Sequence, residues 1–163
     1  MVAAKLAHRV GYQVVDTDQR VVQLAGKSIA AIFGEDGEDT FRDLETVALR
    51  QAATETSVII ALGGGAVLRE ENRRIMKQAG PVVLLSAPPE VIRQRMMGDE
   101  ATASQRPSLT GSGPLDEIER VLAERAPLYA AVADFAVETQ SLSPDQIADR
   151  IQQRYFPHDE QRG

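Results

Sequence analysis

Four short apolar runs separated by helical stretches restrict the fold of this chain more than any other feature. They are rich in β-branched residues, lack strict apolar–polar alternation, and lie at 12–15 (YQVV), 58–62 (VIIAL), 82–85 (VVLL) and 135–138 (FAVE). Strands that alternate with helices form parallel sheets, and runs without alternation are typical of strands covered on both faces. The sequence therefore predicts an open α/β fold with a parallel sheet between layers of helices.

Helical segments are predicted between and after these runs. Residues 37–53 place Phe41, Leu44 and Leu49 on one face, and further helices are expected at 70–79, 88–97, 115–123 and 143–154. The polar segment 98–114 has no periodicity and is too long for a plain connection, which predicts either disorder or a functional lid. We expect one domain over 1–155, with the lid at 98–114 and a polar tail at 156–163.

Composition excludes several classes of function. The chain has 163 residues, 43% of them hydrophobic, which suits a single domain with one core. No apolar run reaches the roughly 18 residues of a membrane span, and a net charge of -6 disfavours nucleic acid as a partner. There is no cysteine, and the two histidines are far apart. We expect a cytoplasmic protein that binds small molecules and no membrane.

The Gly26-Lys27-Ser28 tripeptide resembles the end of a phosphate-binding loop. Such a loop needs a glycine five residues earlier, where this chain has Val21 within a bulky run. Gly26 instead suits the C-terminal glycine of one helix, and Ser28 suits the N-cap of the next. The tripeptide is therefore predicted to be a turn between helices.

Two acids follow the first apolar run directly. In a continued extended conformation, Asp16 and Asp18 would point to the same side at the carboxyl end of the strand, where open parallel sheets bind ligands. This arrangement suits one acid near a metal and one near a substrate. The alternative is that either aspartate merely caps the following helix.

Glycines and arginines supply further candidates. Gly63, Gly64 and Gly65 follow the second run, and three glycines in succession favour close approach of the backbone to a ligand. Arg42 and Glu45 are helix neighbours that form either a surface ion pair or an anion-binding guanidinium held by a carboxylate.

Two more arginines lie in the second half of the chain. Arg106, in the polar segment, could close over a transferring phosphate, and Arg125 is predicted to open a helix whose positive end favours a carboxylate. Taken singly, each is more often solvent-exposed than functional.

Together these segments resemble the shikimate kinase family. The resemblance runs from about residue 3 to residue 152 and is carried by LAHRVGYQVVDTD, GKSIAAIFGEDGEDTFRDLE, IIALGGGAVL, RPSLTG and ERAPLYAAVAD. It implies a three-layer P-loop kinase fold of the nucleoside-monophosphate-kinase type. It also implies ATP-dependent, Mg²⁺-assisted phosphorylation of shikimate to 3-phosphoshikimate in aromatic amino acid biosynthesis, by a monomer.

The same resemblance assigns roles to individual residues. Asp18 resembles the acid that hydrogen-bonds the reacting hydroxyl, and Asp16 its magnesium-side neighbour acting through water. The resemblance also implies that five further residues bind the substrate. Four of them resemble the groups that bind its carboxylate and hydroxyls, namely Arg42, Arg125, Gly64 and Gly65, and the fifth is Gly63. Arg106 resembles the lid arginine on the phosphates, and Arg95 the arginine on the adenine, with Arg93 as its rival. Phosphoryl transfer depends mostly on placement and cationic stabilisation, so a chain without cysteine can perform it.

One family feature has no counterpart in this sequence. The glycine-rich phosphate loop and the first strand precede the helix that leads into GYQVVDTD, and here that helix begins at Met1. In the family this strand is central, and four or five buried aliphatic side chains contribute roughly 6–15 kcal/mol, comparable with the whole stability of a domain. We expect Met1 to be internal to a longer protein. The alternatives are an inactive shikimate-binding relic and another small-molecule P-loop kinase, such as one for gluconate.

Overall fold

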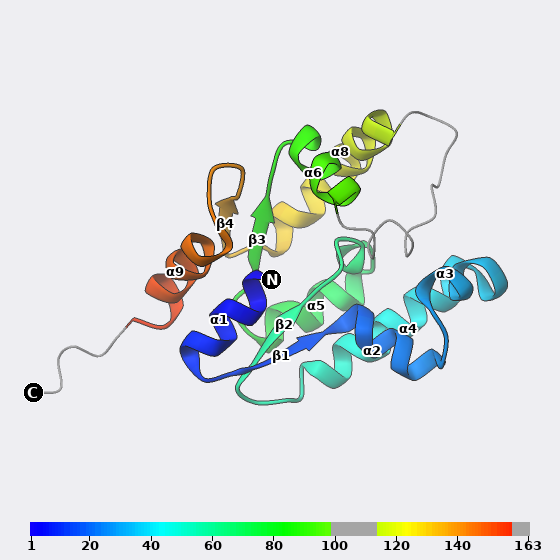
Figure 1. Cartoon of the computed structure of the whole chain (residues 1–163). Coiled ribbons are helices and arrows are strands. Elements are labelled where there is room, and N and C mark those ends of the chain that lie inside the picture. The colour runs from blue at the N-terminus through cyan, green and yellow to red at the C-terminus, as the bar shows by residue number, and fades with distance from the viewer. Residues whose placement is uncertain (99–113, 158–163) are drawn as a thin grey trace, which may run out of the picture.

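Helices and strands alternate along the chain as the sequence predicts (Figure 1). The structure, a computed structural model, describes residues 1–98 and 114–157. The first half contains α1 Val2–Val10, β1 Gln13–Asp16, α2 Thr17–Ala25, α3 Ile29–Ala31, the π-helical η1 Ile32–Asp36, α4 Gly37–Ala52, β2 Val58–Ala61 and the 3₁₀ turn η2 Ala66–Leu68. The second contains α5 Glu70–Ala79, β3 Val83–Ser86, α6 Pro89–Gly98, α8 Pro114–Val132, β4 Phe135–Glu138 and α9 Pro144–Tyr155.

The strands form two parallel pairs. β1 pairs with β2 from Gln13 opposite Val58 to Asp16 opposite Ala61. β3 pairs with β4 from Val83 opposite Phe135 to Ser86 opposite Glu138. Within residues 1–98 and 114–157 these pairs are separate two-stranded sheets, whereas the sequence predicts one sheet.

Local signals end and start the helices where the sequence predicts. Gly26 ends α2 in the left-handed conformation (φ 68°), and the Ser28 side chain caps α3 by accepting a hydrogen bond from the Ala31 amide. Lys27 forms ion pairs with Glu35, at 2.8 Å, and with Asp36. The prediction that this tripeptide is a turn is confirmed.

Helix α8 differs from the prediction. The sequence predicts a helix over 115–123 and a new one opened by Arg125, but one helix runs from 114 to 132 and contains Pro127. A proline inside a helix removes a backbone hydrogen bond and usually interrupts it. Here Leu128, Tyr129 and Val132 beyond the proline pack into the core, and that burial favours continuation. The prediction that Arg125 lies at a helix N-terminus is therefore wrong.

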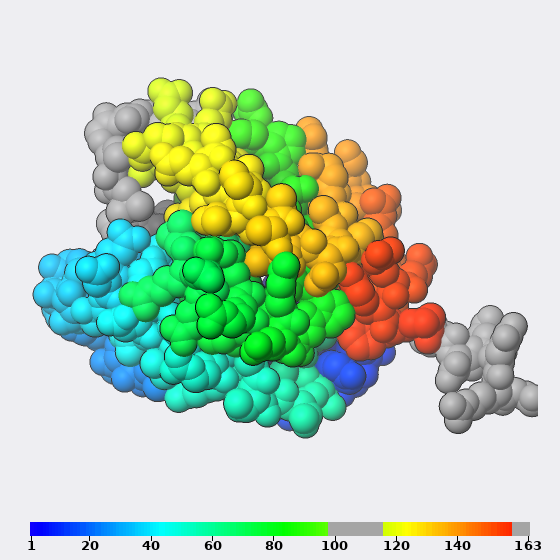
Figure 2. Space-filling model, turned by 180° about the vertical axis from the view of Figure 1, so that it is seen from behind, coloured from blue at the N-terminus to red at the C-terminus, as the bar shows by residue number. Residues whose placement is uncertain are grey.

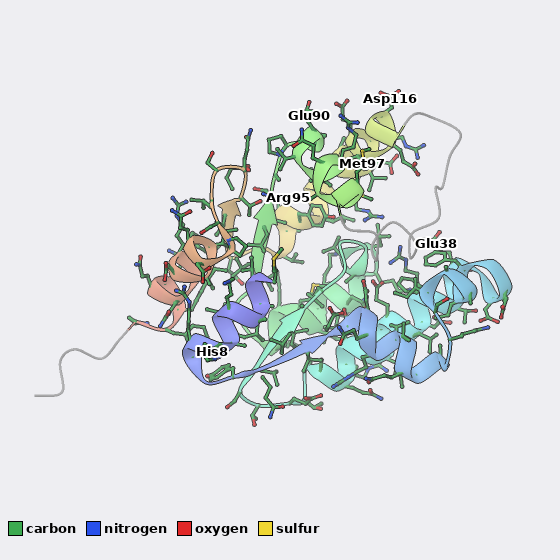
Figure 3. The ribbon with its side chains drawn as sticks, in the orientation of Figure 1. His8, Glu38, Glu90, Arg95, Met97 and Asp116 are labelled. Carbon is green, nitrogen blue, oxygen red and sulfur yellow. The ribbon has the colours of Figure 1, made fainter. Side chains whose placement is uncertain are left out.

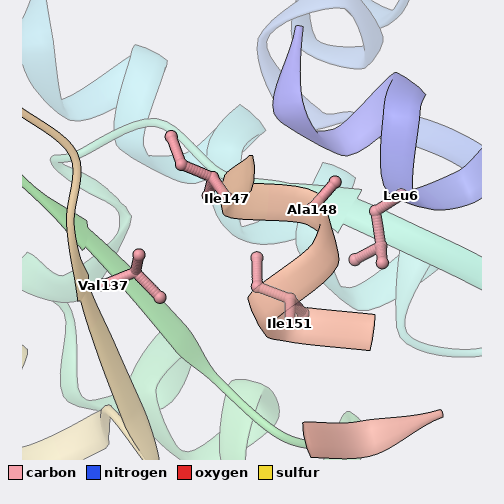
Figure 4. Close-up of a cluster of buried hydrophobic side chains, with 5 residues drawn as sticks. All are labelled: Leu6, Val137, Ile147, Ala148 and Ile151. Carbon is pink, nitrogen blue, oxygen red and sulfur yellow. The ribbon is translucent and has the colours of Figure 1, made fainter. Parts of the chain in front are cut away.

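The core consists of three clusters of buried side chains. One joins α1, β4 and α9 through Leu6, Val137, Ile147, Ala148 and Ile151 (Figure 4). A second lies between α2 and α4, and a third joins α4, η2, α5 and α8. From behind, α8 (yellow) and α5 (green) lie side by side at the surface (Figure 2). The second and third clusters hold the elements that carry the predicted site.

The residue after α9 packs against the start of the chain. Phe156, the first residue of the predicted tail, packs edge-on against Tyr12 with ring centroids 5.4 Å apart; residues 158–163 lie outside the described part of the chain. Among the helices of the described residues, none combines the length and apolar character needed to cross a membrane.

Candidate functional site

The two predicted acids lie at the junction of β1 and α2. β1 ends at Asp16, whose Oδ1 accepts hydrogen bonds from the Asp18 and Gln19 amides at 2.9 and 3.1 Å. Asp16 is thus the N-cap of α2, as expected from the alternative in which one of the two aspartates caps the following helix. The chain turns into the helix at Thr17, so the expected extended arrangement of the two acids is wrong.

A buried threonine fixes the position of this junction. Thr17 is fully buried, and its Oγ1 donates to the carbonyl oxygen of Ala61 at 3.2 Å. The ends of β1 and β2 are thereby joined just before the three glycines. As a result the Asp18 carboxylate lies against Gly63: a Cβ added to Gly63 would be 3.0 Å from Asp18 Oδ1.

We call residues 63–65 the glycine turn. The Gly63 and Gly65 carbonyls accept hydrogen bonds from the Ala66 and Leu68 amides, both at 3.0 Å, which leads the chain into η2. None of the three glycines has a positive φ. Space for neighbouring side chains, and not an unusual backbone conformation, is what requires glycine here, in line with the close approach that the sequence predicts.

Arg42 and Glu45 lie on α4 beside this turn. Arg42 Nη1 donates to Glu45 Oε2 at 2.9 Å, and its Nε and Nη2 donate to Glu38 Oε1 at 3.3 and 3.1 Å. The Glu45 side chain is only 2% exposed and that of Arg42 11%, whereas that of Glu38 is 50% exposed. A Cβ on Gly65 would be 2.8 Å from Arg42 Nη2 and closer still to Nη1. The surface ion-pair alternative is therefore wrong, because the pair is buried against the glycine turn.

Burial raises the pKa of the Glu45 carboxyl above its ordinary value, and the hydrogen bond and positive charge of Arg42 oppose this rise. Smaller effects come from Asp18, which raises the same pKa, and Arg125, which lowers it. The pKa of Glu45 is therefore affected by charged side chains on α2, α4 and α8, so these three helices face one another at this position.

Arg125 reaches the middle of the glycine turn from α8. Its Nη1 would be 3.7 Å from a Cβ on Gly64. Each glycine thus faces a different charged group: Gly63 faces Asp18, Gly64 faces Arg125, and Gly65 faces Arg42. The structure brings together all the predicted substrate-binding residues, and we call them the glycine-turn cluster.

Two predicted nucleotide contacts do not join this cluster. Arg95 on α6 donates to Thr139, from Nη1 to Oγ1 at 2.8 Å and from Nη2 to the carbonyl oxygen at 2.9 Å. Figure 3 shows Arg95 well separated from Glu38, the partner of Arg42. Its rival Arg93 contacts Met97 on the same helix. Arg106 lies outside the described residues.

Within the described residues, neither a histidine nor a cluster of metal-binding side chains lies at the glycine turn. His8 lies on α1, far from Glu38 (Figure 3). Among residues 1–98 and 114–157, no three His, Asp or Glu side chains gather closely enough to hold a metal ion by themselves. Asp16 remains the acid nearest to Asp18 in sequence, with Oδ1 engaged in capping.

Sequence reasoning missed two contributors, Thr17 and Tyr129. Tyr129 Oη donates to the Gly64 carbonyl at 2.9 Å. Tyr129 follows Arg125 by four residues, the spacing that puts two side chains on one helix face. Continuing the predicted helix past Pro127 would have identified it.

The fold and the cluster define a class: an α/β protein of parallel strands that presents a carboxylate, two arginines and bare glycine backbone for a small polar ligand. The family model for shikimate kinase matches residues 1–155. The chain is 42% identical over 149 residues to the shikimate kinase of Rhodopirellula baltica, covering 91% of this chain and 80% of that protein. It is 47% identical over 136 residues to that of Nitratidesulfovibrio vulgaris, covering 83% and 77%.

Solved structures agree with the sequence relatives. Shikimate kinase from Acinetobacter baumannii in complex with shikimate superposes with a TM-score of 0.87 at 33% identity, covering 94% of this chain and 83% of that one. The enzyme from Bacteroides thetaiotaomicron gives a TM-score of 0.82 at 27% identity, covering 94% and 89%. The chain belongs to the shikimate kinase family. The predicted P-loop kinase fold and enzyme class are confirmed, and membership of a kinase family implies use of ATP.

Proposed function

We propose that this chain transfers a phosphoryl group from ATP to a hydroxyl of shikimate, giving 3-phosphoshikimate for aromatic amino acid biosynthesis, with the glycine-turn cluster as its substrate site. The observation that carries the proposal is the convergence of Asp18, Arg42 and Arg125 on three consecutive glycines. An acid, two guanidinium groups and unobstructed amides match a small carboxylate that bears several hydroxyls. The shikimate kinase of Acinetobacter baumannii, whose structure contains shikimate, is similar to this chain over 94% of its length.

The carboxylate of the substrate is assigned to the two arginines. Buried Glu45 holds Arg42 Nη1, so that this nitrogen cannot turn away. Among the described residues, the Nε and Nη2 edge is paired with half-exposed Glu38. Exposed ion pairs are worth little, so a substrate carboxylate can replace Glu38 on this edge. Arg125 supplies the second cation from α8.

Asp18 is assigned to the reacting hydroxyl. It lies in the first turn of α2, and its carboxylate lies against Gly63, a residue without a side chain. A carboxylate accepts the hydrogen bond of the hydroxyl and can take its proton as the phosphoryl group arrives. The amides of Gly64 and Gly65 are assigned to the remaining hydroxyls.

The nucleotide side of the reaction rests on sequence-based roles. Asp16 fits an acid that reaches Mg²⁺ through water, because its Oδ1 is already engaged in the helix cap. Mg²⁺ would neutralise phosphate charge when bound. Arg106 on the phosphates, Arg95 on the adenine, the lid at 98–114, the monomeric state and the cytoplasmic location remain predictions.

Turnover by the purified protein, including any segment that its gene encodes ahead of Met1, tests the proposal. ADP formation that depends on shikimate, and that gluconate neither supports nor inhibits, is the expected result. ADP formation with gluconate alone would refute the assignment of the substrate. Binding of shikimate without any turnover of ATP would instead favour the inactive, shikimate-binding alternative.

A further inference from the structure

One hydroxyl group connects helix α8 to the glycine turn. Tyr129 Oη donates to the Gly64 carbonyl oxygen at 2.9 Å, and a Cβ added to Gly64 would be 3.2 Å from the same hydroxyl. The missing side chain of Gly64 therefore leaves the space through which the tyrosine reaches the backbone.

The ring of Tyr129 is anchored while its hydroxyl faces the site. Tyr129 and Leu128 pack against the buried cluster of Leu49, Ala66, Val67, Met76 and Val132. Arg125, one helical turn earlier, contacts the same glycine. A packed tyrosine ring has few rotamers to lose, so its hydroxyl is held in place at small entropic cost.

The carbonyl of Gly64 belongs to the same planar unit as the amide of Gly65. The peptide bond between them is trans and planar, so the direction of the C=O fixes the direction of the following N–H. Glycine otherwise has the greatest backbone freedom of any residue. A hydrogen bond to this carbonyl thus restricts the amide that follows it.

We propose that Tyr129 is a positioning residue for shikimate: its hydroxyl fixes the Gly64–Gly65 peptide, so that the Gly65 amide faces the ligand, and it holds the α8 face that carries Arg125. This rests on the proposed function of the glycine-turn cluster. Tyr129 does not itself need to touch the substrate.

Two variants of the full chain test this inference. Tyr129→Phe removes only the hydroxyl. Tyr155→Phe is the matched control, since its ring packs edge-on against Phe135, at 6.4 Å between centroids, and Tyr155 lies on α9 outside the glycine-turn cluster. Calorimetry with shikimate should give a dissociation constant raised roughly 3- to 10-fold by Tyr129→Phe, the loss of one hydrogen bond. Tyr155→Phe should leave it unchanged.

Amide exchange gives a second readout that does not depend on the ligand. In Tyr129→Phe, exchange should accelerate at residues 63–66 and stay at parental rates in α4 and α9. Unchanged affinity for shikimate in this variant, or acceleration spread evenly over the molecule, would overturn the inference. Failure of the parent chain to bind shikimate would refute the proposed function and the ligand named here. The amide-exchange comparison would then still test whether the Tyr129 hydroxyl restricts the backbone of the glycine turn.

Discussion

Asp18 is the residue on which the chemistry of the proposed site depends. In Asp18→Asn the amide can still hydrogen-bond but cannot take a proton, so turnover of shikimate should fall by at least about 100-fold. The free energy of unfolding should change by less than about 1 kcal/mol, because Asp18 lies at the site and outside the core clusters. Steady-state kinetics and denaturant unfolding measure the two effects.

Asp43→Asn is the matched control for that variant. Asp43 is exposed on α4 and pairs with Arg69 at 2.7 Å, and exposed pairs contribute little. Its turnover should equal that of the parent chain. Near-normal turnover in Asp18→Asn would show that another group accepts the proton.

Gly65 is predicted to be required for space alone. Its φ of -86° is open to alanine, but a Cβ would collide with the Arg42 guanidinium. Because Glu45 holds this group in place, Gly65→Ala should force it out of its position and weaken shikimate binding by about 10-fold or more. Gly34→Ala is the control, since a Cβ there meets nothing within 4 Å. Equal affinity in the two variants, measured by calorimetry, would argue against the proposed role of Arg42.

Glu45 should make stability depend on pH in a defined direction. Burial raises its pKa above 4.5 in the folded chain, so folding favours the protonated carboxyl. Its contribution to stability is fully present below about pH 4.5 and is lost as pH rises through the folded-state pKa. The difference in unfolding free energy between parent and Glu45→Gln should therefore shrink as pH rises.

Asp145 provides a contrast of opposite sign. Its hydrogen bonds with Lys5 and Arg9 lower its pKa below 3.8, so its contribution is present above that pH and is lost as pH falls through the folded value. The difference in unfolding free energy between parent and Asp145→Asn should grow as pH rises toward 3.8, whereas that between parent and Glu45→Gln should shrink as pH rises above about 4.5. Parallel profiles for the two pairs, from denaturant unfolding at a series of pH values, would contradict the cause given for Glu45.

At the scale of elements, α9 depends on its first turn. Ser143 Oγ accepts a hydrogen bond from the Gln146 backbone amide at 3.2 Å, and Gln146 Oε1 accepts one from the Ser143 backbone amide at 2.8 Å. Ser143→Ala should lower the free energy of unfolding by about 0.5–2 kcal/mol. Thermal unfolding measures the loss, and Ser141→Ala, at an exposed position, should fall within about 0.5 kcal/mol of the parent. Equal stability of the two variants would show that the cap is dispensable.

Element positions could be predicted from the sequence wherever the signal is local. The four strands lie within one residue of their predicted bounds, and the Gly26–Ser28 turn follows from two capping residues. The course of the chain at Thr17 and at Pro127 could not be predicted. It is decided by contacts with Ala61 and with the core cluster beside α5, which are distant in sequence.

At the scale of the molecule, the site joins two halves. Asp18, Arg42 and the glycine turn belong to the half built on β1 and β2, and Arg125 and Tyr129 belong to α8, which packs with α6 beside β3 and β4 (Figure 1). The meeting of Asp18 with the three glycines could be predicted, because both follow strand ends, whereas Arg42 and Arg125 lie within helices and were placed at the site by the family resemblance. The sequence did not predict the separation into two strand pairs, since strand pairing depends on which chain segments are present to fill the sheet.

Titration of the full chain with shikimate by calorimetry tests most directly whether these groups form one binding site. The parent should bind one shikimate, and Arg125→Ala should weaken binding by about 10-fold or more through loss of a charged hydrogen-bond donor. Arg74→Ala, on the exposed face of α5, should bind like the parent. Absence of binding by the parent, or equal affinity in all three proteins, would contradict the assignment of the glycine-turn cluster as the shikimate site.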